Sequence, residues 1–123
     1  MTVQEIGTQL VALCNEGRDR EAVDRFYDEK IVSIEAGGDG DMPARMEGIA
    51  AIRGKHDWWY DNHEVHETAA EGPYCGHRED QFAVRHTMDI TPKGGERMQM
   101  AEVALYTVKD GKIVQEEFLY QVG

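Results

Sequence analysis

Several side chains of this sequence could carry out proton transfer. Glu35 follows a β-branched segment, Glu116 lies in a late apolar segment, and His56 and His86 are two of the five histidines between them. A carboxyl group that is partly buried has a raised pKa, which suits it to act as a general base. The candidate catalytic residues are Glu35, His56, His86, Glu116 and Tyr120.

Each candidate also has a plain structural interpretation. Glu35 could be a rim carboxylate in water, and Glu116 could simply pair with a histidine. His56 and His86 could be core residues whose hydrogen bonds are satisfied. The sequence leaves these alternatives open.

The histidines also raise the question of a metal site. The segment His63-Glu-Val-His66 differs from the His-Glu-x-x-His motif, which places both imidazoles one helical turn apart. On a strand, residues three apart point to opposite faces. We therefore expect no metal and no cofactor.

A helix over residues 48–62 is expected to position much of the site. Its stripe at helical spacing starts apolar and then carries imidazoles: Ile49, Ile52, His56, Trp59 and His63. Trp58 and Trp59 are about 100° apart on a helix, so only Trp59 is expected inside. We expect Trp58 at an edge or in a dimer contact, and Lys55 as a rim charge.

The remaining elements follow from periodicity, caps and turn residues. Expected helices cover 3–16, with Thr2 as N-cap, and a segment that Asp19 caps. The expected strands are 31–35, 63–70, 81–90, 97–108 and 112–121, and the expected loop and turns are 36–45, 72–73, 92–95 and 110–111.

Turn lengths predict which strand residues share a face. A two-residue turn at 110–111 pairs Val108 with Ile113, and a four-residue loop at 92–95 pairs Thr91 with Glu96. The expected inner face then comprises Phe82, Val84, His86, Met88, Ala101, Val103, Leu105, Val114, Glu116, Phe118 and Tyr120. The outer face would carry an Arg85–Glu102 ion pair among apolar residues, which predicts a homodimer through this face.

Composition limits the class of protein. The chain has 123 residues, enough for a single domain over 1–123, and a formal net charge of −11. Such a charge argues against nucleic acid and anionic membranes as partners. Cys14 and Cys75 are expected to be free thiols, and without a secretory leader we expect a cytoplasmic protein.

Four segments make the chain resemble the nuclear-transport-factor-2-like superfamily, in particular its SnoaL-like, polyketide-cyclase-like members. These segments are Phe26–Tyr27, Ile31–Glu35, Gly48–Arg53 and Asp110–Tyr120. The resemblance implies an α+β cone-shaped roll. In it, a strongly bent, mostly antiparallel sheet wraps around about three N-terminal helices and leaves an apolar pocket.

Ketosteroid isomerase, a member of this superfamily, implies roles for some positions. Its base lies at the place of Glu35, and its pocket tyrosines lie at the places of Tyr27 and His56. The two hydrogen-bond donors of its oxyanion hole align with Leu10 and Val103. Neither side chain can donate a hydrogen bond, so both donors are missing here. The expected substrate-binding residues are Tyr27, Trp59, Phe82, Val84, Met88, Val103 and Phe118.

Two main hypotheses follow. The first is a cofactor-independent isomerase, dehydratase or cyclase that handles a small apolar or aromatic metabolite by acid–base catalysis. The second is a non-catalytic ligand-binding or dimerisation module of the same fold. A third, an epoxide hydrolase with a carboxylate–arginine–carboxylate set, requires Arg85 and Glu102 to face inward, against the expected register.

Overall fold

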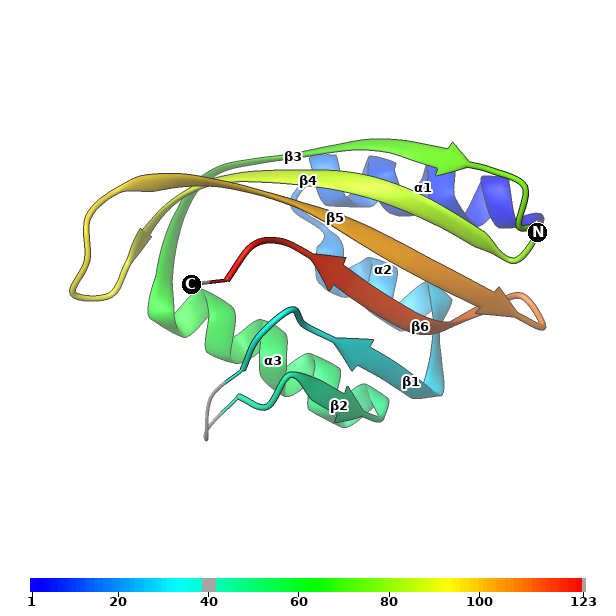
Figure 1. The fold of residues 1–123 in the computed structure, drawn as a ribbon, viewed down its shortest axis with the longest axis horizontal. Helices are drawn as coiled ribbons and strands as arrows, with labels where there is room; N and C mark the ends of the chain where they lie inside the picture. Colours follow the sequence, from blue (N-terminus) through cyan, green and yellow to red (C-terminus); the bar gives the residue numbers. More distant parts are fainter. Residues whose placement is uncertain (39–41, 123) are drawn as a thin grey trace.

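A curled sheet of six strands and three helices form the protein in the computed structural model, which describes residues 1–38 and 42–122 (Figure 1). The helices are α1 (Val3–Asn15), α2 (Asp19–Phe26) and α3 (Ile49–Asn62). The strands are β1 (Tyr27–Ile34), β2 (Arg45–Glu47), β3 (His63–Cys75), β4 (Gln81–Pro92), β5 (Met98–Lys109) and β6 (Lys112–Leu119). None of the helices in these described ranges is long and apolar enough to cross a bilayer.

The strand order is β2-β1-β6-β5-β4-β3, and all neighbours are antiparallel except β1 and β6, which are parallel. The α1 helix lies along β3 and β4, and α3 lies across the opening between β1 and the start of β3 (Figure 1). The expected α+β cone is therefore confirmed. Residues 39–41 of the expected loop lie outside the described residues.

Local sequence explains where the helices begin. Thr2 and Glu5 form a capping box at α1, with Glu5 N donating to Thr2 Oγ1 at 3.1 Å and Thr2 N donating to Glu5 Oε1 at 3.0 Å. Arg18, without a side-chain cap, takes the N-cap position of α2 that was expected for Asp19. Asp19 is instead the first helical residue, where its charge suits the helix dipole.

Two expected boundaries are wrong. Residues 72–73 do not turn the chain, because β3 continues to Cys75 and absorbs the interruption as an irregularity between Glu71 and Tyr74. Strand β1 begins at Tyr27, directly after α2, rather than at Ile31. Bulges of this kind lengthen strands past residues that normally signal turns.

The register of β5 differs from the expected one by one residue. The pair Val108–Ile113 is confirmed, but a bulge at Thr107–Val108 then pairs Tyr106 with Glu116. On the other side, β4 pairs His86 with Glu102 rather than with Ala101. A one-residue slip moves every side chain of a strand to the other face.

This slip corrects the expected inner face. Three residues expected inside, Ala101, Val103 and Leu105, point to the outer face, and Val103 is 38% exposed. Glu102, Ala104 and Tyr106 take their places inside. The expected Arg85–Glu102 ion pair is wrong, because only Arg85 is on the outer face.

Candidate functional site

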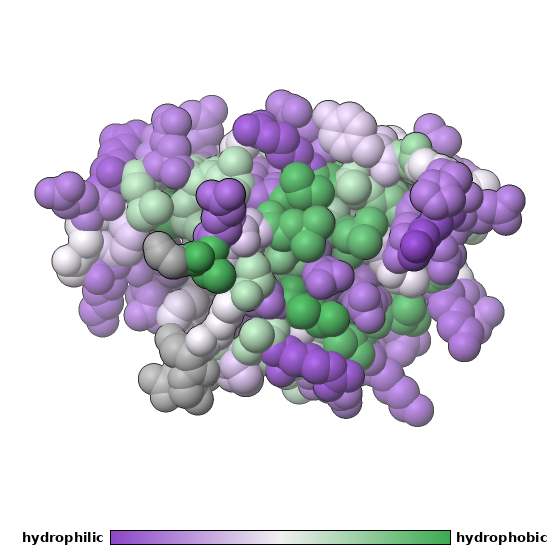
Figure 2. Space-filling view, in the orientation of Figure 1, coloured by the Kyte–Doolittle hydropathy of each residue, from purple (hydrophilic) through white to green (hydrophobic). Residues whose placement is uncertain are grey.

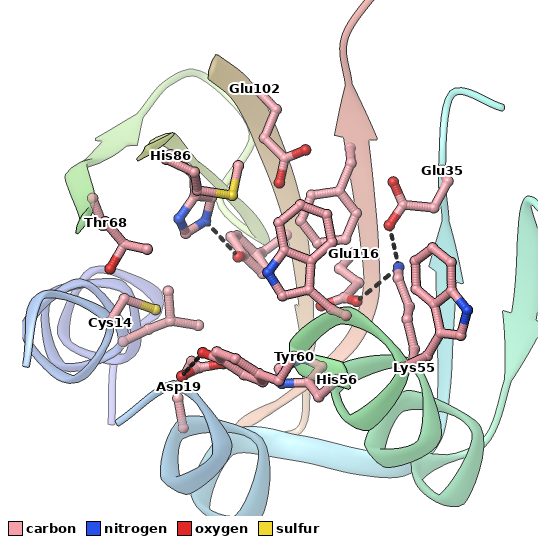
Figure 3. Close-up of a pocket in the computed structure, with 18 of the residues that line it drawn as sticks. Cys14, Asp19, Glu35, Lys55, His56, Tyr60, Thr68, His86, Glu102 and Glu116 are labelled. Atoms are coloured by element: carbon pink, nitrogen blue, oxygen red, sulfur yellow. Dashed lines mark hydrogen bonds and ion pairs between the residues drawn. The ribbon is translucent and has the colours of Figure 1, made fainter. Parts of the chain in front are cut away.

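An apolar cavity of about 350 Å³ lies between α3 and the concave face of the sheet (Figure 3). This volume lies within the range of about 300–1,000 Å³ that is usual for small-molecule sites. Its apolar walls include Leu10, Met46, Trp58, Trp59, Met88 and Phe118. Two clusters of polar residues reach the cavity.

The first group, the Glu35 cluster, comprises Glu35, Lys55, Ser33, Glu116 and Tyr120. The Glu35 carboxylate forms an ion pair with Lys55 through Oε1 and accepts a hydrogen bond from Tyr120 Oη through Oε2 at 2.9 Å. Lys55 Nζ also donates to Ser33 Oγ at 2.8 Å. Because the Lys55 and Glu35 side chains are only 16% and 21% exposed, water screens this pair little.

Glu116 anchors the floor of this cluster. It is 1% exposed, and Tyr27 and Ser33 each donate a hydrogen bond to one of its two carboxylate oxygens, the Ser33 bond at 2.7 Å. Burial and the nearby Glu116 charge raise the pKa of Tyr27 well above its usual value, so its hydroxyl stays a donor. The expected burial of Glu116 is confirmed, but a tyrosine and a serine satisfy it rather than a histidine.

Glu102 projects from β5 into the same cavity (Figure 3). Within the described ranges, its carboxyl group has neither a hydrogen bond nor an ion pair. Burial, helped by the Glu35 charge and opposed by Lys55, raises the pKa of Glu102 to about 7. This carboxyl group can therefore hold or release a proton near neutral pH.

His86 lies on the wall next to Glu102 and contacts Tyr106. Its Nε2 is 3.1 Å from Tyr106 Oη, and burial lowers the pKa of His86 to about 4 although the Asp19 charge opposes this. The imidazole is thus neutral at physiological pH. Cys14 lines the cavity as an unreactive thiol, since burial raises its pKa to about 12.

The second group, the Asp19 cluster, comprises Asp19, His56 and Tyr60 on the α2–α3 side of the cavity (Figure 3). Asp19 Oδ2 is 3.2 Å from His56 Nδ1, and Asp19 Oδ1 accepts a hydrogen bond from Tyr60 Oη at 2.9 Å. Burial works to raise the pKa of Asp19, but these contacts outweigh it and hold the pKa below its usual value. Asp19 therefore stays ionised beside the imidazole.

Comparison with known proteins identifies the family. The sequence model of the SnoaL-like domain matches residues 1–120. The chain belongs to the SnoaL-like family. No curated protein matches this SnoaL-like chain at a significant level.

Solved structures share the SnoaL-like fold. A Mesorhizobium loti protein, named as a candidate SnoaL-like polyketide cyclase and as a carbohydrate phosphatase, is 45% identical with a TM-score of 0.89, covering 98% of this chain and 100% of that one. A Mycobacterium tuberculosis protein in complex with estradiol-17β-hemisuccinate has 17% identity and a TM-score of 0.75 over 99% and 96% of the two chains. A computationally designed 17-OHP binder has 17% identity and a TM-score of 0.72 over 99% and 95%.

The SnoaL-like cavity brings together most of the residues expected from the sequence. The expected residues that line it are Tyr27, Glu35, His56, Trp59, His86, Met88, Glu116 and Phe118. Tyr120 reaches it through Glu35. Phe82 and Val84 are buried in the core without lining the cavity, and Val103 points away from it, so these three assignments are wrong.

The polar cavity residues that were missed include Asp19, Lys55, Glu102 and Tyr106, and Ser33, which bonds to Lys55 behind the cavity wall, was missed too. Lys55 was expected at the rim, yet it lies three residues after Ile52 and four before Trp59, which is the spacing of the inward stripe. Alternation with Ile31 could have identified Ser33. Glu102 and Tyr106 were missed only because the expected register of β5 differs from the observed one by one residue.

The remaining histidines of α3 and β3 have structural roles. His63 stacks on Trp59 with ring centroids 3.8 Å apart, and His66 Nε2 is 2.7 Å from Thr91 Oγ1. Across residues 1–38 and 42–122, no group of three or more histidine, cysteine, aspartate or glutamate side chains has the arrangement of a metal site.

Proposed function

We propose that this SnoaL-like protein binds a small apolar or aromatic carbonyl compound and catalyses proton transfer beside the carbonyl without a cofactor. Isomerases, dehydratases and cyclases use this chemistry. One observation carries the proposal: Glu35 and Glu102 reach the same apolar cavity in opposite environments. Glu35 is ion-paired, whereas Glu102 has no partner among the described side chains and a pKa of about 7. Two carboxyl groups with such different surroundings suit the roles of base and acid.

Glu35 is the proposed base. It forms an ion pair with Lys55, and the hydrogen bond from Tyr120 fixes its orientation. It would remove a proton from the carbon next to the carbonyl group. Lys55 would remain close to the negative charge that develops on the substrate.

Protonated Glu102 is the proposed hydrogen-bond donor to the carbonyl oxygen. A neutral carboxyl group in a desolvated site stabilises a developing oxyanion. The ketosteroid isomerase resemblance supports this role, because that enzyme places a protonated carboxyl on its next-to-last strand. Glu102 lies on the next-to-last strand here, beside the position of Val103 that the sequence alignment suggested.

The other cavity residues would support these two groups. Glu116 would hold Ser33, and through it Lys55, while neutral His86 and Tyr106 would form a polar part of the wall. The substrate-binding surface would come from the apolar and aromatic side chains of Tyr27, Trp59, Met88 and Phe118.

Deuterium exchange tests the proposal without knowledge of the natural substrate. The probe is 4-phenyl-2-butanone in D₂O, with loss of the proton signals beside the carbonyl followed by NMR. Wild-type protein should accelerate the exchange and Glu35→Gln should remove the acceleration. Glu117→Gln is the matched control. This glutamate follows Glu116 in β6 and pairs with Leu105 of β5, so the variant should exchange like wild type. Equal rates for wild type and Glu35→Gln would refute the proposed base.

Ligand binding without turnover is the second candidate. Structures of the same fold carry a steroid hemisuccinate or were designed to bind 17-OHP, which favours a cavity that can serve binding alone. In that case, 2-naphthol should bind, as followed by its fluorescence, while no variant changes the exchange rate of the ketone.

We also propose a homodimer through the outer sheet face. Apolar side chains are exposed there: Val103 at 38% and its strand neighbour Leu119 at 50%. Hydrophobic residues gather near the middle of the face seen in Figure 2. Light scattering should give twice the monomer mass, and Val103→Lys with Leu119→Lys should give a monomer. A monomeric wild type at micromolar concentration would reject the dimer.

A further inference from the structure

The Asp19 cluster has no role in the proton abstraction proposed above, yet its geometry is that of a proton donor. His56 Nδ1 faces Asp19 Oδ2 at 3.2 Å, so Asp19 holds the orientation of the ring. Tyr60 occupies the other oxygen of Asp19. Within the described ranges, His56 Nε2 has no hydrogen-bond partner, and His56 lines the cavity.

The two clusters lie on different sides of the cavity. Asp19 is on α2, whereas Glu35 directly follows β1 on the other side (Figure 3). Lys55 and His56 are adjacent on α3, so their side chains leave the helix about 100° apart. A ligand that contacts Lys55 and Glu35 at one end would therefore meet His56 at another.

We propose that Asp19 and His56 form a second proton-transfer site, which protonates an oxygen leaving group on the same ligand. The inference rests on the function proposed above and narrows it to the elimination of water from an apolar β-hydroxy carbonyl compound. Isomerisation needs one base that moves a proton, whereas elimination of water needs a base and a separate acid at a second atom. The cavity offers both.

The elimination balances with these groups alone. Glu35 takes the proton from the carbon beside the carbonyl, and that electron pair forms the new carbon–carbon double bond. The carbon–oxygen bond breaks, and the oxygen leaves as water with the proton from His56 Nε2. Glu35 then returns its proton to solvent and His56 takes one up, so no oxidant or reductant is involved.

The substrate probe is 4-hydroxy-4-phenyl-2-butanone in D₂O, which allows two measurements on one sample. NMR follows deuterium entry beside the carbonyl, and ultraviolet absorbance follows the conjugated enone. Wild type should catalyse both reactions. His56→Gln should slow enone formation by about 100-fold or more, the usual contribution of a general acid, while deuterium entry changes by less than about 3-fold.

Two further variants complete the test. Asp19→Asn retains a polar side chain at the same place and should produce the same split between the two rates, so a folding defect of one variant does not decide the result. His66→Gln makes the same substitution on a histidine outside the cavity and should leave both rates unchanged.

The outcomes separate this inference from the proposed function. Deuterium entry without enone formation in wild type would overturn the second site and leave the proposed base intact. Equal losses of both rates in His56→Gln and Asp19→Asn would also overturn it, because the cluster would then be structural. Absence of both reactions in wild type, together with no exchange of 4-phenyl-2-butanone, would overturn the proposed function as well.

Discussion

Ser33 connects Lys55 to Glu116: its hydroxyl accepts a hydrogen bond from Lys55 Nζ at 2.8 Å and donates one to Glu116 Oε2 at 2.7 Å. A single hydroxyl thus joins the cavity ion pair to a fully buried carboxylate. Ser33 is itself 0% exposed, so no bulk water can replace it. Lys55 Nζ thus lies between Glu35 and Ser33, with Glu116 Oε2 at 4.0 Å behind the serine.

Ser33→Ala tests that link. It removes a donor from a buried carboxylate, which costs about 1–3 kcal/mol of unfolding free energy. Urea denaturation should report this loss, and the exchange rate of 4-phenyl-2-butanone should fall because Lys55 loses one of its contacts. Thr8→Ala is the control, since its exposed hydroxyl donates to Gln4 O within α1, far from the cavity, and its loss should change neither quantity much. An unchanged stability of Ser33→Ala would show that the link carries little energy.

Glu102 predicts the pH dependence of the proposed activity. Its carboxyl donates to the substrate only while protonated, and its pKa is about 7. Exchange should therefore decrease as pH rises through about 7. Glu102→Gln keeps a donor that does not titrate, so exchange should persist with this decrease removed. If Glu102→Gln instead abolishes exchange at every pH, Glu102 is the base and the two carboxyl roles are reversed.

Glu102 also predicts the pH dependence of stability. Its pKa is about 7 in the folded protein against a usual 4.5, so the folded state holds the proton that the unfolded state releases. Stability should fall as pH rises from about 4.5 to about 7 and then level off, by on the order of 3 kcal/mol. Glu102→Gln should thus be more stable than wild type at pH above 7 and similar near pH 4, as measured by urea denaturation. Equal stabilities at both pH values would contradict the burial of this group.

Titration of His86 should make the free energy of unfolding decrease as the pH falls, which is opposite to the effect of Glu102. Burial lowers its pKa from 6.5 to about 4, so the unfolded state binds a proton that the folded state refuses. The His86 contribution is complete above pH 6.5 and is lost as pH falls through about 4, again on the order of 3 kcal/mol. Titration of Glu102 changes the stability in the opposite direction over part of this pH range. The effect of His86 is therefore best measured by comparing Glu102→Gln with the double variant Glu102→Gln/His86→Gln. The double variant should lose less stability on acidification.

Much of the fold could be predicted because local signals and the global pattern agree. The capping residue Thr2, the stripe of α3 and the turn at Asp110–Gly111 each placed an element correctly. Strand register could not be predicted, because one bulge at Thr107–Val108 and one loop decide it, and neither leaves a periodic signal. Since the face of β5 follows from register, Glu102 was assigned to the wrong side.

Two glycines in helices give a prediction about packing. A Cβ at Gly7 would lie 2.7 Å from Pro73 Cβ and 3.0 Å from Phe82, whereas a Cβ at Gly54 has no other atom within 4 Å. Alanine favours helix by about 1 kcal/mol over glycine, so Gly54→Ala should raise the unfolding free energy by up to that amount. Gly7→Ala gains the same propensity but forces α1 away from β3, and overpacking costs about 1–3 kcal/mol. Thermal denaturation should show a higher melting temperature for Gly54→Ala and a lower one for Gly7→Ala. A higher melting temperature for Gly7→Ala would show that α1 and β3 can move apart without loss of stability.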